Sequence, residues 1–234
     1  MKKLSFLYLL AISVTASNAA TILSTDFSDV TGSGTDTATF SWDTVSGVDA
    51  PASNLVISGE TGSPVLYASS TTNEEMNINY QWNLTGRNFL STTIEDLSLA
   101  AGVDSIDLTN FSVLFDTRAN GGGNQAGGKN NIEVEVEIIG SISGSLGSNS
   151  VTQSEPGSTG GLTYDIDLSS LASLNSSETY DVILTVNVAD SGGAHYGAID
   201  TIVLDGDITF VPEPSSVVLL GLGGLGLVLR RRRN

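Results

Sequence analysis

The sequence of 234 residues contains no cysteine. Disulfide bonds are therefore excluded as a source of stability, and zinc sites built on thiolates are excluded as well. The stability of a folded domain in this chain must come from its apolar core, with or without the help of a bound metal ion.

Basic residues are scarce in the central part of the chain. The sequence has 9 lysine and arginine residues against 26 aspartate and glutamate residues. Six of the basic residues lie at the two ends, whereas Glu213 is the one acidic residue outside positions 21–210. This central part thus keeps 3 basic and 25 acidic side chains, a net charge of about −22. Such a surface repels nucleic acid and anionic lipid, and it suits a solvated exported protein that binds divalent cations.

A helical apolar stripe is almost absent between residues 21 and 210. Instead, apolar and polar residues alternate, most clearly over 76–82 and over 132–138, where Glu133, Glu135 and Glu137 oppose an apolar face. Alternation with period two is typical of strands that have one face in the core and one in water. The remaining strand candidates span 21–27, 37–42, 55–58, 64–69, 105–108, 111–115, 162–168, 180–188, 199–204 and 207–210.

From these candidates we expect roughly nine to eleven short strands in the fold, separated by glycine- and serine-rich turns such as residues 141–150. The absence of alternating helices argues against a βαβ layout. The pattern predicts an all-β fold, a two-sheet β-sandwich of the jelly-roll type. A β-helix ranks second because no solenoid repeat is visible. Residues 169–178 are the one stretch left for a single helical turn.

The amino-terminal end has the pattern of a secretory signal peptide. Lys2 and Lys3 precede an apolar run over 4–14, and small residues follow up to Ala19 and Ala20. This order predicts export through the Sec translocon with cleavage after Ala19 or Ala20. The sequence therefore divides into a signal peptide over 1–20, a cargo domain over 21–210 and a separate segment over 211–234.

The carboxyl-terminal segment has three parts in a fixed order. A Pro-Glu-Pro turn at Pro212, Glu213 and Pro214 is followed by an uncharged apolar run over 217–229. Four arginines then close the segment, namely Arg230, Arg231, Arg232 and Arg233. The apolar run is short for a membrane span, but a dense cationic block beside it acts as a stop-transfer signal. We expect a single transmembrane helix here.

These residues resemble a known sorting signal. Val211, Pro212, Glu213, Pro214 and Ser215, with the Gly/Leu-rich run and the arginine cluster after them, are similar to the PEP-CTERM signal of exported bacterial proteins. The resemblance implies recognition and cleavage near Pro-Glu-Pro by an exosortase. It also implies a stay in the membrane, transient or permanent, and delivery to the cell surface or the extracellular matrix. It covers about two dozen residues and implies nothing about the cargo domain.

Two kinds of metal-binding pattern can be weighed in the cargo domain. The row of three glutamates places carboxylates about 7 Å apart on one strand face, and a solvated face explains it without a metal. The EF-hand pattern is absent. By analogy with jelly-roll domains in which a structural Ca²⁺ joins the first and last strands, Asp26 and Asp200 would be the ligands of a calcium ion.

Signals for catalysis and ligand binding are weak. His195 is the single histidine, and no G-x-S-x-G elbow supplies a nucleophile for it. Glycosidase chemistry needs two carboxylates in a cleft, and the many acidic residues do not single out a pair. Among the aromatic residues available for carbohydrate, Tyr196 is the one expected to be exposed; the others are Trp42, Trp82, Tyr164 and Tyr180.

We therefore predict an exported, non-catalytic component of the cell surface or of an exopolysaccharide-associated extracellular matrix. The first alternative is a carbohydrate-binding module, with or without stabilisation by calcium. The second alternative is a secreted hydrolase. Affinity for polysaccharide distinguishes the first alternative, and turnover that depends on one carboxylate distinguishes the second.

Overall fold

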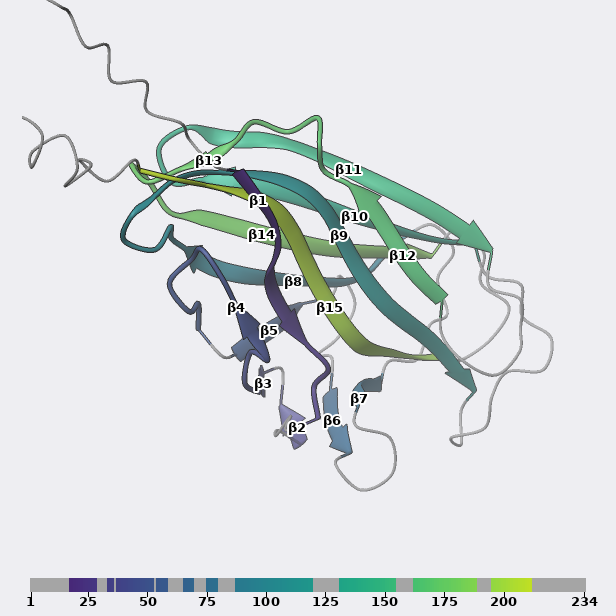
Figure 1. The fold of residues 1–234 in the computed structure, drawn as a ribbon. Helices are drawn as coiled ribbons and strands as arrows, with labels where there is room; N and C mark the ends of the chain where they lie inside the picture. Colours follow the sequence, from purple (N-terminus) through teal and green to yellow (C-terminus); the bar gives the residue numbers. More distant parts are fainter. Residues whose placement is uncertain are drawn as a thin grey trace, which may run out of the picture.

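The computed structural model describes residues 17–28, 33–35, 37–52, 54–58, 65–69, 75–79, 87–119, 131–154, 162–188 and 195–211. Every regular element in these ranges is a β-strand (Figure 1). Nine of them form one sheet: β1 (Ser17–Thr25), β2 (Ser33–Thr35), β4 (Thr44–Val45), β6 (Val65–Ser69), β7 (Glu75–Asn79), β9 (Val103–Ala119), β12 (Leu162–Asp167), β13 (Leu174–Asn175) and β15 (His195–Phe210).

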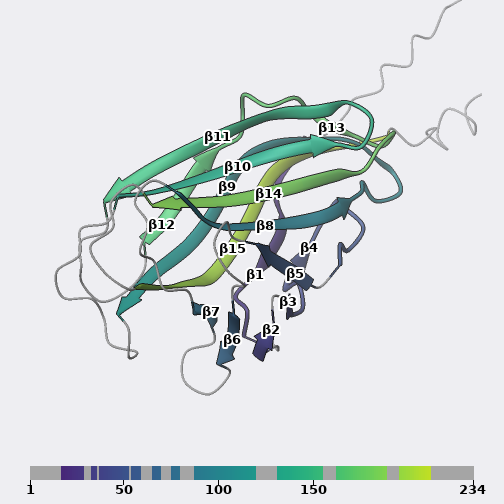
Figure 2. The ribbon, with the colours of Figure 1, turned by 180° about the vertical axis from the view of Figure 1, so that it is seen from behind.

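The other six form a second sheet: β3 (Thr37–Thr39), β5 (Asn54–Ser58), β8 (Arg87–Leu97), β10 (Asn131–Gly140), β11 (Gly144–Ser154) and β14 (Tyr180–Val188). The order in this sheet is β11-β10-β14-β8-β5-β3, whereas the main path of the larger sheet is β12-β9-β15-β7-β6-β2. Figure 2 shows the two sheets as stacked layers. The prediction of an all-β, two-sheet sandwich is confirmed, and all the strand pairs of the described residues are antiparallel.

The long strands β9 and β15 form the spine of the larger sheet. Phe111 lies opposite Leu204, and Val113 lies opposite Ile202. The sequence predicts two strands in each of these places, over 105–108 and 111–115 and over 199–204 and 207–210. In β9 the buried positions shift by one between Leu108 and Phe111, because Asp205 lies opposite Asn110 and Gly206 lies opposite Leu108, which leaves Thr109 as an extra residue. In β15 the alternation continues through Gly206, and both strands are continuous.

Strand β10 confirms the alternation predicted over 132–138. Ile132, Val134, Val136 and Ile138 are fully buried, whereas the three glutamates between them are half-buried on the outer face. The strand lies between β11 and β14, so both of its edges are paired. The inner residues belong to one apolar core shared by both sheets, which also includes Phe27, Val48, Leu97, Phe111, Phe115, Tyr164, Ile166, Tyr180, Leu184, Ile199 and Ile208.

Two strands differ from the sequence prediction. Residues 144–154 form edge strand β11 rather than a serine- and glycine-rich connection, and residues 87–97 form β8, for which the sequence shows no clear alternation. Residues 169–178 hold turns and the short strand β13 instead of a helical turn.

The first and last described strands run side by side. Ser17 of β1 pairs with Thr209 of β15, and Thr25 pairs with Ile202. The amino end of β1 and the carboxyl end of β15 therefore lie at the same end of the sandwich (Figure 1). The segments predicted to direct export and sorting adjoin this end.

Candidate functional site

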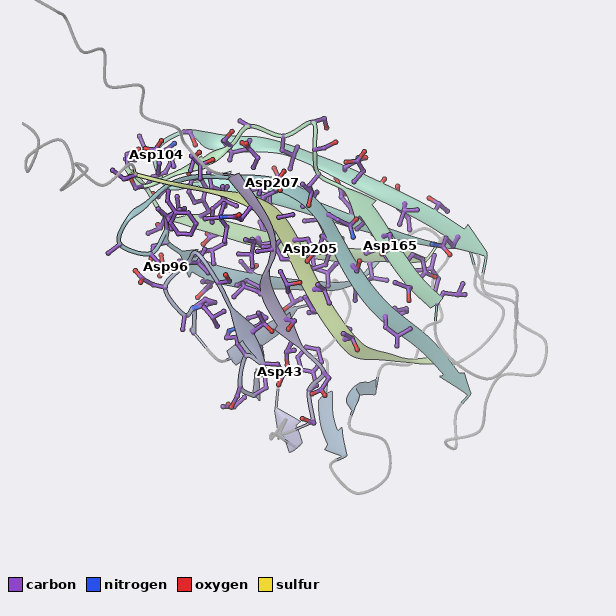
Figure 3. The ribbon with its side chains drawn as sticks, viewed as in Figure 1. Asp43, Asp96, Asp104, Asp165, Asp205 and Asp207 are labelled. Carbon is purple, nitrogen blue, oxygen red and sulfur yellow. The ribbon has the colours of Figure 1, made fainter. Side chains whose placement is uncertain are left out.

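The outer face of the larger sheet carries a row of hydrogen-bonded polar side chains. Asn110 Nδ2 donates to Ser112 Oγ at 2.8 Å, and Ser112 Oγ donates to a carboxylate oxygen of Asp165 on the adjacent strand β12. On the other side of β15, Thr21 Oγ1 donates to Asp205 Oδ1 at 2.8 Å. Figure 3 labels Asp165 and Asp205 on this face. Strand alternation creates the row, since the inward neighbours of these residues are apolar.

Two aspartates of this face oppose each other directly. Asp107 of β9 pairs with Asp207 of β15, and Ser173 Oγ donates a hydrogen bond to Asp107 Oδ1. Opposed like charges on neighbouring strands are unfavourable unless water or a cation separates them. Asp207 is half-buried and Asp107 is exposed, so water reaches the pair.

The outer face of the smaller sheet is also polar, and its carboxylates are partly engaged. Glu133 accepts hydrogen bonds from Ser150 Oγ at 3.2 Å and from Asn187 Nδ2 at 3.3 Å. Glu137 accepts one from Ser145 Oγ at 2.8 Å. These partners come from the strands on both sides of β10, and they relieve the repulsion along the glutamate row without a metal ion.

A turn at one end of the smaller sheet is held by a carboxylate that sequence reasoning did not single out. Glu178 Oε2 accepts hydrogen bonds from the backbone N–H groups of Ile142, at 2.8 Å, and Ser143, at 2.9 Å. The N–H of Ser143 and then that of Ile142 lower the pKa of Glu178. Glu178 and Ser143 are 35 positions apart in the sequence, so no local sequence pattern predicts the contact.

The predicted calcium ligands lie near each other along the backbone. Asp26 follows the last residue of β1, and Asp200 falls in a register shift of β15 close to the Thr25–Ile202 pair. The side chain of Asp26 accepts a hydrogen bond from Ser28 N at 2.9 Å, and its backbone N–H donates to Asp43 Oδ2 at 2.8 Å. The side chain of Asp200 lies outside the described residues. Within the part of the chain that is described, no group of three or more histidine or acidic residues is arranged to hold a metal ion.

The aromatic residues considered for carbohydrate binding fall in different environments. Tyr164 and Tyr180 are buried in the core, so neither offers a surface to a sugar. Trp42 is half-buried and packs edge-to-face on Phe40, with ring centroids 5.0 Å apart. Tyr196 lies in β15, opposite Arg118, but its side chain is outside the described residues, as is the whole of Trp82.

Both shifted carboxyl pKa values in the described part of the chain move downward. The hydroxyl and the backbone N–H of Ser169 lower the pKa of Asp167, as the turn N–H groups lower that of Glu178. These groups are held as carboxylates by hydrogen bonds.

The junction with the carboxyl-terminal segment is well defined. Phe210 ends β15, and the backbone N–H of Val211 donates to the carbonyl oxygen of Gly102 at 2.9 Å. Pro212, Glu213, Pro214 and the four terminal arginines lie outside the described residues. So does the run over 217–229; among the residues that are described, no helix is long and apolar enough to span a membrane. Ala19 and Ala20, the predicted signal cleavage residues, lie in β1 opposite Asp207 and Gly206.

Residues 210–233 match the PEP-CTERM protein-sorting motif. The resemblance of the carboxyl-terminal segment is thereby confirmed. Proteins with this motif are exported and sorted to the cell surface by exosortase, so the motif implies processing of this chain by exosortase. No curated protein matches the sequence.

Solved structures show a distant likeness in fold. The carbohydrate-binding module TmCBM61, solved in complex with β-1,4-galactotriose, is 12% identical over 64% of this chain and 86% of its own, with a TM-score of 0.38. The native family 12 xyloglucanase from Bacillus licheniformis is 14% identical over 82% and 100% of the two chains, with a TM-score of 0.29. The family 12 xyloglucanase from Bacillus licheniformis in complex with a ligand is 12% identical over 81% of this chain and 98% of its own, with a TM-score of 0.28. Likeness at this level says nothing about ligand or activity.

Proposed function

We propose that this protein is a non-catalytic component of the cell surface or of an exopolysaccharide-associated extracellular matrix, delivered there by exosortase. The observation that carries the proposal is the direct attachment of the sorting motif to the sandwich. The motif begins at Phe210, the last residue of β15, which is paired along its length with β9. The sandwich is thus the cargo that the motif carries.

A passive role is supported by the state of the outer carboxylates. Asp165, Asp205, Glu133 and Glu137 accept hydrogen bonds from neighbouring strands. Such contacts hold these side chains in place on a hydrated surface. A secreted hydrolase would instead need a carboxyl group with a raised pKa beside a second carboxylate, and it is the least supported role.

Polysaccharide binding is the second candidate, favoured by the composition of the smaller sheet's outer face. Hydroxyl, amide and carboxylate groups alternate there across β11, β10 and β14, with Ser150, Glu133 and Asn187 in hydrogen-bonding contact. These groups are able to donate to and accept from sugar hydroxyls. In this role Tyr196 would add a stacking surface, and a calcium ion between Asp26 and Asp200 would stabilise the fold.

The decisive experiment replaces Pro212, Glu213 and Pro214 by alanine in the native host. Intact mass is then measured on protein from the membrane and medium fractions. The wild type is expected to yield a species that ends near Pro214. The variant is expected to stay in the membrane, without the signal peptide but with the carboxyl-terminal segment up to Asn234 still attached. The change Ser176→Ala, in an exposed turn of the sandwich, controls for expression.

The same preparations separate the two roles. Released wild-type sandwich is passed over immobilised polysaccharide from the host's matrix. Retention with micromolar or tighter affinity would favour the binding role over the passive one. Unchanged processing of the alanine variant would contradict sorting by exosortase.

A further inference from the structure

One end of the sandwich exposes apolar side chains around the junction with the sorting segment. Ile142 is 78% exposed, Val211 is 50% exposed and Phe210 is 45% exposed. They account for three of the four large apolar side chains that the described residues leave exposed, the other being Val45. Ile142 lies in the turn between β10 and β11, and its exposed side chain is not part of the apolar core.

Backbone contacts place these residues at the same end. Val211 is hydrogen-bonded to Gly102, in the loop between β8 and β9. The last residue of β8, Leu97, pairs with Tyr180 of β14, and Tyr180 pairs in turn with Gly140, next to the turn that carries Ile142. Figure 2 shows the β10–β11 turn and the end of β15 on the same side of the molecule.

The turn that carries Ile142 is fixed in shape. Glu178 binds the N–H groups of Ile142 and Ser143, and Ser141 N donates to the carbonyl oxygen of Thr179 at 2.9 Å. A Cβ on Gly140 would lie 2.5 Å from Glu178 Oε2, so a side chain there would displace the carboxylate. The apolar side chain is therefore presented at a defined position, without the entropy cost of ordering a mobile loop on contact.

We infer that this end of the sandwich, through Ile142, Phe210 and Val211, contacts the lipid surface of the membrane while the sorting segment is still anchored. The inference rests on the proposed insertion of residues 217–229 into the membrane. Six residue steps from Val211 to Val217 span at most about 20 Å. The interfacial zone of a bilayer takes up about 5 to 8 Å of this distance on each side. The junction end of the sandwich is thus the end tethered nearest to the lipid.

The charge of the sandwich determines which lipid surface it tolerates. Asp96 and Asp104 are exposed near this end and are labelled in Figure 3. Carboxylates at that position are repelled by anionic headgroups over about 10 Å at 0.1 M salt. The contact therefore fits a zwitterionic surface, and in an anionic bilayer it should strengthen as salt is added.

The absence of native cysteine allows a direct test with single labelled positions. Ile142→Cys and Thr152→Cys are each labelled with the same environment-sensitive fluorophore in the full-length protein. Thr152 is exposed on β11, eight residues or about 26 Å along the strand from its first residue, Gly144. A label at this position reports how far the apolar fluorophore by itself partitions into lipid. Each protein is reconstituted into phosphatidylcholine vesicles with and without a lipid that carries a nitroxide quencher.

Quenching at position 142 is expected to exceed that at position 152 at least threefold. Equal quenching in protein that co-floats with the vesicles would overturn the lipid contact while leaving membrane insertion intact. Failure of the protein to co-float would overturn the insertion and this inference together. A difference that appears only after exosortase is added would also overturn the inference, because the partner would then be a protein.

Discussion

Two consecutive residues of β9, one on its inner face and one on its outer face, should differ strongly in how much stability their replacement by alanine removes. Phe111 is fully buried and lies opposite Ile166 of β12 and Leu204 of β15. Its neighbour Ser112 points to the outer face, where it donates to Asp165 and accepts from Asn110. Replacing each residue by alanine should therefore give very different losses of stability.

The expected magnitudes follow from burial. Removal of a buried phenylalanine side chain costs about 3–5 kcal/mol, a large share of the roughly 5–15 kcal/mol by which domains are stable. In a domain of this size that loss lowers Tm by about 6–20 °C. Ser112→Ala removes hydrogen bonds of a partly exposed hydroxyl and should cost about 1 kcal/mol or less, which corresponds to about 4 °C or less.

The assay is thermal and urea unfolding of the exported protein, followed by circular dichroism. Equal urea slopes for the two variants would establish that the comparison concerns stability rather than a change of unfolded state. If Phe111→Ala lost no more stability than Ser112→Ala, the inner and outer faces of β9 would be wrongly assigned. The register between β9 and its neighbours would then be wrong as well.

Two further predictions concern charge. Because its turn hydrogen bonds lower the pKa of Glu178 below the usual 4.5, the ionised carboxylate stabilises the fold fully above that value and loses this effect as the pH falls through the lowered pKa. The Tm difference between wild type and Glu178→Gln should thus be constant from pH 6 to 8 and shrink below about pH 4.5. A difference that does not change with pH would contradict the stabilising role of the hydrogen bonds between the Glu178 carboxylate and the turn N–H groups. Asp207→Asn should raise stability by about 0.2–1 kcal/mol at low salt by relieving the opposed Asp107. That gain should vanish at about 1 M salt, and a loss of stability at low salt would show that the pair is bridged.

How far the sequence predicts this fold depends on how well each strand alternates. The alternation of β10 could be predicted over 132–138, because every inner position there is apolar and every outer position is a glutamate. The ends of the strand, at Asn131 and at Ile139 and Gly140, lie outside this pattern and are not predicted by it. Strand β8 could not, because a threonine, Thr92, occupies a core position and Asp96 adopts a left-handed φ of 56° that interrupts the period. Strand β11 escapes prediction for another reason. Its residues are half-buried or exposed at a sheet edge, and pairing with β10 rather than burial defines it.

The candidate site shows the same division between local and non-local information. The sorting motif is predictable because its meaning is contained in consecutive residues. The hydrogen bond between Glu178 and the turn at Ile142 is not predictable in this way, because the two segments meet only after β10 and β14 have paired. Likewise, Tyr164 looks available to a ligand in the sequence, and only its place on the inner face of β12 removes it from the surface.

The geometry of the junction also bears on why processing can leave the cargo intact. A protease needs its substrate in an extended form that is free of other backbone partners. Thr209 is paired with both β1 and β9, Phe210 is paired with Val103, and Val211 is bound to Gly102. Cleavage upstream of Pro212 would require β15 to leave the centre of the larger sheet, together with the core residues Ile208 and Leu204. Cleavage at the Pro-Glu-Pro motif requires none of this, so the fold itself protects the sandwich up to the residue where the sorting segment begins.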